Sequence, residues 1–104
     1  MFNILVVDDQ AHIRRLYEYT LEKNGYQPYT AGDGAQALKL METTHIDLVI
    51  LDLMMPTMDG IETCRALRCD PALKETMVVF LSALGEEEQQ LAGFGAGADD
   101  YISK

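Results

Sequence analysis

Two nearly continuous apolar runs, each followed at once by aspartate, constrain the fold of this chain most strongly. Residues 2–7 (FNILVV) lead into Asp8 and Asp9, and residues 46–51 (IDLVIL) lead into Asp52. Buried strands of a parallel sheet have this Val/Ile/Leu-rich composition, and their carboxyl ends open onto the crevice where ligands bind. The two runs therefore predict central parallel strands with three carboxylates at one rim.

Helical and strand patterns alternate along the rest of the chain. Amphipathic spacing or a capping signal predicts helices that begin near residues 10, 33, 59 and 86. Strands are predicted over residues 2–7, 26–31, 46–51, 77–81 and 100–103. Pro28 places the second strand toward an edge, and three glycines predict that the fourth helix is the loosest. Each crossover is long enough for a right-handed parallel connection, so we expect a doubly wound α/β domain.

Composition favours one small soluble domain and excludes several classes of function. The chain has 104 residues and a net charge of −9, from 17 acids against 8 lysines and arginines, so we expect no nucleic-acid binding by this segment. It has no leading basic and apolar segment and no apolar run near the ~18 residues that cross a bilayer, which predicts a cytoplasmic protein without a membrane anchor. Cys64 and Cys69 lack the spacing of a zinc site and are interpreted as free thiols.

The predicted rim requires a cation. At ~4 Å and an effective dielectric constant of ~20, each pair of carboxylates repels by about 4 kcal/mol. Lys104, which ends the fifth strand run, can neutralise one charge, and Mg²⁺ suits the remaining hard oxygen ligands. With the hydroxyl of Ser82 at a fourth strand end, this set of groups is typical of a phosphoryl site in which one carboxylate attacks in line.

Five segments together resemble the response-regulator receiver domain of two-component signalling. They are residues 4–9 (ILVVDD), 47–56 (DLVILDLMMP), 58–60 (MDG), 81–83 (LSA) and 97–104 (GADDYISK). The resemblance spans residues 1–104 and implies a flavodoxin-like, five-stranded parallel sheet in the order 2-1-3-4-5. It also implies a fifth helix after Lys104 that this sequence lacks, so we expect an uncovered sheet face and association into a homodimer through it.

The resemblance implies a role for each acid. Asp52 would be the phosphoacceptor and would share the magnesium ion with the other two acids. Asp9 would ligate Mg²⁺ directly and Asp8 through water, while the backbone carbonyl of Met54 would complete the protein's ligands. Considered alone, Asp9 would more often be the N-cap of the following helix.

Three further residues have roles that the resemblance alone implies. Ser82 and Lys104 would each bind an oxygen of the phosphoryl group. Tyr101 would turn inward when Ser82 moves toward the phosphorylated aspartate, and this would change a partner-binding surface around the fourth helix and fifth strand.

The function that we expect is a switch phosphorylated by a sensor histidine kinase or a phosphotransfer protein. Such a domain catalyses its own phosphorylation and dephosphorylation and is not a turnover enzyme. An interaction module that works without phosphorylation is the alternative. A magnesium-dependent phosphohydrolase ranks last, because such enzymes need a second acid where this chain has Met54.

Overall fold

The structure is a computed structural model that describes residues 2–52, 60–82, 95 and 97–103. Strands and helices alternate in the order β1 (Asn3–Val7), α1 (Ala11–Lys23), β2 (Gln27–Ala31), α2 (Gly34–Thr43), β3 (Leu48–Asp52), α3 (Gly60–Cys69), β4 (Met77–Ser82) and β5 (Asp100–Ser103). The strands pair in parallel in the order β2-β1-β3-β4-β5. The predicted parallel α/β fold is therefore confirmed. A fourth helix is predicted to begin near residue 86, but residues 83–94 lie outside the described part of the chain.

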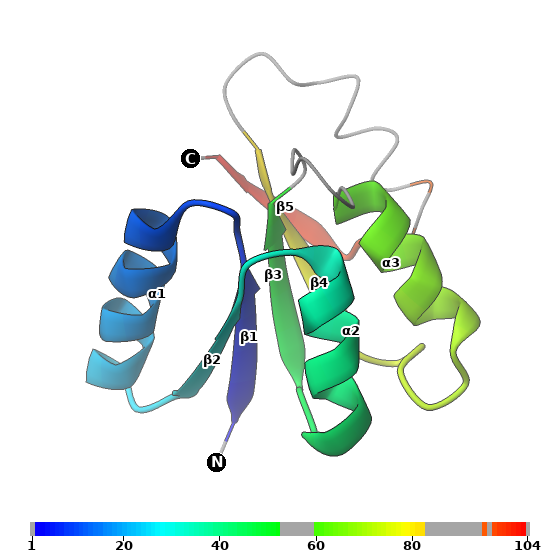
Figure 1. The fold of residues 1–104 in the computed structure, drawn as a ribbon, viewed down its shortest axis with the longest axis horizontal. Helices are drawn as coiled ribbons and strands as arrows, with labels where there is room; N and C mark the ends of the chain where they lie inside the picture. Colours follow the sequence, from blue (N-terminus) through cyan, green and yellow to red (C-terminus); the bar gives the residue numbers. More distant parts are fainter. Residues whose placement is uncertain (1, 53–59, 83–94, 96, 104) are drawn as a thin grey trace.

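Helices cover both faces of the sheet, because successive strand residues point to opposite sides. Figure 1 shows α2 and α3 together on one side and α1 on the other. Leu5 and Val7 of β1 belong to the core beneath α2 and α3, whereas Ile4 and Val6 belong to the core beneath α1. This double coverage explains why the central strands are almost entirely apolar.

Local signals fix the ends of the first two helices. Helix α1 is followed by Asn24 and by Gly25, whose φ of +84° is one that glycine adopts readily. At the start of α2, the Asp33 carboxylate accepts a hydrogen bond of 2.8 Å from the Gln36 amide, which confirms the predicted cap. Strand β2, with Pro28, lies at the sheet edge as predicted.

The α1 face of the sheet is unevenly covered. Leu81 is buried there, but Met77, on the same face of β4, is 49% exposed. Ile102, which pairs with Leu81 in register, is 42% exposed. Homodimer formation through this face stays a prediction.

None of the helices within the described residues is both long and apolar enough to cross a membrane.

Candidate functional site

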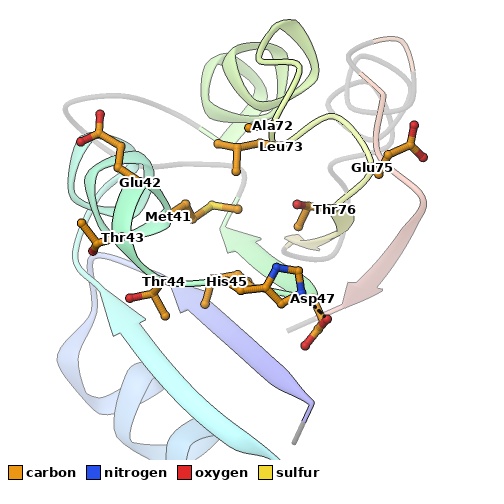
Figure 2. Close-up of a pocket in the computed structure, with 11 residues that line it drawn as sticks. Met41, Glu42, Thr43, Thr44, His45, Asp47, Ala72, Leu73, Glu75 and Thr76 are labelled. Atoms are coloured by element: carbon orange, nitrogen blue, oxygen red, sulfur yellow. Dashed lines mark hydrogen bonds and ion pairs between the residues drawn. The ribbon is translucent and has the colours of Figure 1, made fainter.

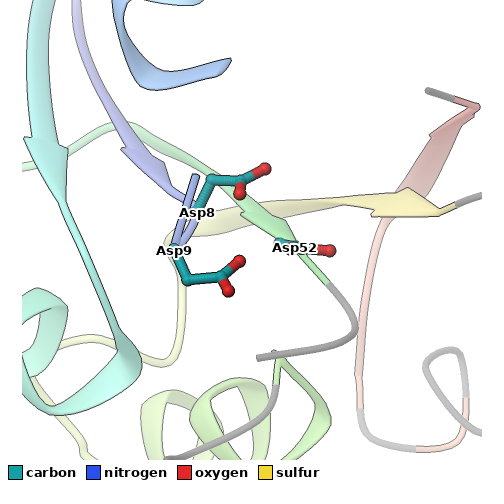
Figure 3. A group of neighbouring side chains, drawn as sticks. All are labelled: Asp8, Asp9 and Asp52. Carbon is teal, nitrogen blue, oxygen red and sulfur yellow. The ribbon is translucent and has the colours of Figure 1, made fainter. Parts of the chain in front are cut away.

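Three carboxylates meet at the carboxyl edge of the sheet. Asp8 and Asp9 follow β1, Asp52 is the last residue of β3, and one oxygen from each lies within 4.8 Å of the other two. Figure 3 shows the three side chains projecting to the same side of the strand ends. Asp8 is fully buried and Asp52 is 4% exposed, whereas Asp9 is exposed to solvent. The structure thus brings the three predicted acids together in a site that opens to solvent at Asp9.

Asp8 is held by three hydrogen bonds, two through its main chain and one through its side chain. Its amide donates to the carbonyl of Ala31 at the end of β2 (3.2 Å), and its Oδ1 accepts from the amide of Gln10 (2.9 Å). Its carbonyl oxygen accepts from the Arg14 guanidinium of α1 (2.6 Å). Helix α1 has Gln10 as its N-cap, without a side-chain cap bond, so Asp9 is not the N-cap of this helix.

Asp52 is positioned by the close approach of α3. Gly60 begins this helix and is buried, and a methyl group on its Cα would overlap the carbonyl oxygen of Asp52 and lie 2.9 Å from the Phe80 ring. Glycine therefore lets the start of α3 lie directly against the end of β3. Gly60 belongs to the Met58-Asp59-Gly60 motif of the sequence, but that motif alone does not indicate this packing role.

The other predicted site residues are placed only in part. The backbone of Ser82 pairs with Ser103, one position beyond the pair of Asp52 and Leu81, so Ser82 reaches the carboxyl edge of the sheet. The backbone of Tyr101 pairs with Phe80 in β4. The side chains of Ser82 and Tyr101 lie outside what the structure describes, as do Met54 and Lys104 entirely. Their predicted roles stay predictions.

The chemistry of the acid cluster suits a hard divalent cation. Three negatively charged groups at this separation repel one another, and a cation among them would relieve that repulsion. Carboxylate oxygens are the ligands that Mg²⁺ prefers, and the solvent-exposed side at Asp9 leaves room for the water molecules that this ion retains.

A surface pocket of about 410 Å³ lies at the opposite, amino edge of the sheet. It is lined by residues 41–47, from the end of α2 to the start of β3, and by Ala72, Leu73, Glu75 and Thr76 before β4 (Figure 2). Its His45 Nε2 lies 2.9 Å from Asp47 Oδ1, and Asp47 Oδ2 accepts a 2.8 Å hydrogen bond from the Asn3 amide. The bond from Asn3 is the main cause of a lowered pKa of Asp47, and His45 adds to it. This carboxylate therefore ties β3 to the start of β1.

Two arginines that donate to main-chain carbonyls were not identified from the sequence. Arg14 contacts the main chain of Asp8, as described above. Arg68 of α3 donates to the carbonyls of Lys74, Thr76 and Gly97 and to the Asp99 carboxylate. Because all but one of these acceptors are main-chain carbonyls, which every residue has, no residue pattern in the sequence indicated the contacts.

Comparison with known sequences connects this site to a family. The family model described as the response regulator receiver domain matches residues 4–104. The alkaline phosphatase synthesis transcriptional regulatory protein PhoP of Bacillus subtilis is 46% identical over 101 residues, which are 97% of this chain and 41% of that protein. The transcriptional regulatory protein ResD of Bacillus subtilis is 48% identical over the same shares. The chain thus spans about two fifths of the length of these curated relatives.

Solved structures give the same assignment. The chemotaxis protein CheY4 of Vibrio cholerae superposes with a TM-score of 0.95 at 34% identity, over 100% of this chain and 87% of that one. The N-terminal domain of a response regulator receiver protein from Methanoculleus marisnigri superposes with a TM-score of 0.88 at 40% identity, over 100% and 85%. Sequence and fold therefore agree along the whole chain.

Proposed function

The chain belongs to the response regulator receiver domain family of two-component systems, and on this basis we propose that it is a phosphorylation-controlled switch with Asp52 as phosphoacceptor. The observation that carries the proposal is the meeting of Asp8, Asp9 and Asp52 within 4.8 Å at one end of the sheet. Asp52 ends the central strand β3 and lies against the start of α3, so its position is held from two sides.

The acid cluster fits the Mg²⁺ ion that receiver domains typically bind at an acidic pocket. Asp9 would ligate it directly, Asp8 would act through water, and Asp52 and the Met54 carbonyl would complete the protein's share. When bound, the ion would supply positive charge that offsets the charge on the acids and on the incoming phosphoryl group.

In the proposed reaction, a carboxylate oxygen of Asp52 attacks the phosphorus of a phosphohistidine on a sensor kinase or phosphotransfer protein. A phosphorus–oxygen bond forms to Asp52 while the phosphorus–nitrogen bond breaks, and the imidazole leaves with its electron pair. Asp8 is held by three hydrogen bonds, so it needs little reorganisation during this step. Ser82 and Lys104 would each bind a phosphoryl oxygen.

The signal would pass from Asp52 through the end of β4 to β5. Ser82 and Ser103 are paired neighbours in these strands, and Tyr101 lies two residues before Ser103. We propose that movement of Ser82 toward the phosphoryl group lets Tyr101 turn inward and changes a surface that partners recognise. The domain would catalyse its own phosphorylation and dephosphorylation in the cytoplasm and would not turn over a separate substrate.

Intact-mass analysis after incubation with acetyl phosphate and Mg²⁺ tests the proposal. We expect one added phosphoryl group on the wild type and none on Asp52→Asn. Glu22→Gln removes one exposed acid of α1 away from the cluster and is the matched control, which should be phosphorylated like the wild type.

Two other outcomes would select other functions. If neither acetyl phosphate nor a phosphorylated histidine kinase modifies the wild type, the domain is an interaction module that works without phosphorylation. If phosphate is released continuously from an added phosphomonoester and Asp52→Asn stops the release, the domain is a hydrolase. Either result would contradict the switch.

A further inference from the structure

Arg14 is a cationic side chain that contacts the main chain of Asp8, a member of the acid cluster. It lies in the first turns of α1, is half-buried, and donates through Nη1 to the carbonyl oxygen of Asp8 at 2.6 Å. A bond from a charged donor at this distance is among the stronger hydrogen bonds of proteins. Its acceptor is a main-chain atom, so the bond fixes backbone geometry directly.

The carbonyl of Asp8 belongs to the peptide unit that joins Asp8 to Asp9. That unit is planar, so a bond that fixes its oxygen also fixes the amide and the Cα atom of Asp9, from which the Asp9 side chain leaves the backbone. On the other side, the Asp8 amide is held by the Ala31 carbonyl. The guanidinium therefore completes the attachment of a short segment that carries two of the three clustered carboxylates.

The same guanidinium group also lies beside the next loop. Its Nη1 is 3.6 Å from the position that a Cβ atom on Gly32 would occupy, between β2 and α2. The Gly32 amide in turn donates to the Gln36 side chain (3.2 Å). Arg14 thus joins α1 to the end of β1 through a hydrogen bond and lies close to the loop after β2.

From these contacts we propose that Arg14 is a positioning residue for divalent-cation binding, which deepens the function proposed above and rests on it. By fixing the peptide between Asp8 and Asp9, it keeps both carboxylates directed toward Asp52. Loss of groups that orient metal ligands typically weakens metal binding by about 10- to 100-fold. We expect a weakening near the lower limit for Arg14→Gln, because Ala31 and Gln10 still hold Asp8.

The sign of the effect separates positioning from simple electrostatics. Removal of a positive charge close to three carboxylates makes the site more negative, so electrostatics alone predicts unchanged or tighter binding of a cation. Arg15 provides the matched control, because it is the next residue of α1, carries the same charge and is exposed. Arg15→Gln should therefore leave the affinity for Mg²⁺ within about twofold of the wild type or make it slightly tighter.

The test is isothermal titration calorimetry of the intact chain with Mg²⁺ alone, for the wild type, Arg14→Gln, Arg14→Lys and Arg15→Gln, with urea unfolding of each variant in EDTA. We expect the Kd for Mg²⁺ to rise about tenfold in Arg14→Gln and less in Arg14→Lys, which keeps one cationic donor. A Kd for Arg14→Gln within twofold of the wild type, whatever its stability, would overturn the inference. If Arg14→Gln is unfolded in EDTA, Arg14→Lys decides on the same criterion. Wild type that binds no Mg²⁺ would instead overturn the proposed magnesium site itself.

Discussion

The two edges of the sheet use aspartate in opposite ways. At the amino edge, Asp47 accepts a hydrogen bond from the Asn3 amide and lies 2.9 Å from His45. Asp99 likewise accepts a hydrogen bond from the Val78 amide and lies 2.9 Å from Arg68. At the carboxyl edge, Asp8, Asp9 and Asp52 are brought within 4.8 Å of one another.

Acids of the first kind stabilise the fold, because a charged acceptor binds a main-chain amide and a neighbouring basic side chain at once. Acids of the second kind repel one another, and this repulsion opposes folding. Repulsion between neighbouring aspartates therefore opposes folding at the carboxyl edge, and this is the edge that suits a cation.

The largest expected effect is at the amino edge, where Arg68 ties α3 to the segments before β4 and β5. Its guanidinium donates to three carbonyls and to Asp99, and its stem lies against Gly97, whose φ is +105°. We expect Arg68→Met to lower the free energy of unfolding by about 3 kcal/mol, because several acceptors lose a charged donor. Urea unfolding in EDTA measures this change.

Arg65→Met is the control for that experiment. Arg65 is an exposed residue of the same helix, so its replacement should change stability by less than about 0.5 kcal/mol. Equal losses in the two variants would show that the contacts of Arg68 contribute no more than a surface charge.

The next effect compares the same substitution at the two edges. Asp99→Asn keeps an oxygen acceptor but loses the charge that faces Arg68, so it should destabilise by about 1–2 kcal/mol. Asp9→Asn removes one of three clustered charges at an exposed position, so in EDTA it should stabilise by about 1 kcal/mol. Urea unfolding of both variants under the same conditions checks the two signs, and changes of like sign would contradict the comparison.

Magnesium should reverse the order of stability of the wild type and Asp9→Asn. A ligand at ten times its Kd stabilises the folded state by about 1.4 kcal/mol. We expect an increase of this size for the wild type when EDTA is replaced by Mg²⁺, and little or none for Asp9→Asn, which lacks one carboxylate ligand. The difference in urea midpoint with and without Mg²⁺ is the measurement, and an equal increase in both proteins would exclude Asp9 from the cation site.

Much of this organisation could be predicted from the sequence, because the apolar runs specify buried parallel strands and the carboxyl ends of parallel strands share one edge. Asp8, Asp9 and Asp52 could be assigned to one site for that reason alone. The boundary of β3 was less accurate, since the strand runs over Leu48–Asp52 and the apolar run over residues 46–51.

The arginine contacts could not be predicted in the same way. Asp8 and Arg14 lie six residues apart and Arg68 and Gly97 lie 29 apart, and in both bonds the acceptor is a carbonyl that any residue would offer. Only the folded backbone determines which carbonyl lies within reach of a guanidinium. The contacts at the amino edge could therefore not be predicted from the sequence, although both edges carry aspartates.

The smallest expected effect is a dependence of stability on pH at Asp47. Its pKa lies below the ordinary value of 3.8, chiefly because the Asn3 amide donates to the carboxylate, with a further contribution from His45. A folded-state pKa below the unfolded one means that the stabilisation is fully present above about pH 4 and is lost as pH falls through the folded-state pKa. Between pH 5 and pH 2, urea unfolding should therefore show a shallower loss of stability for Asp47→Asn than for the wild type. His45→Gln should retain most of the wild-type slope, because the bond from Asn3 is the larger cause; a slope as shallow as that of Asp47→Asn would make His45 the dominant partner instead.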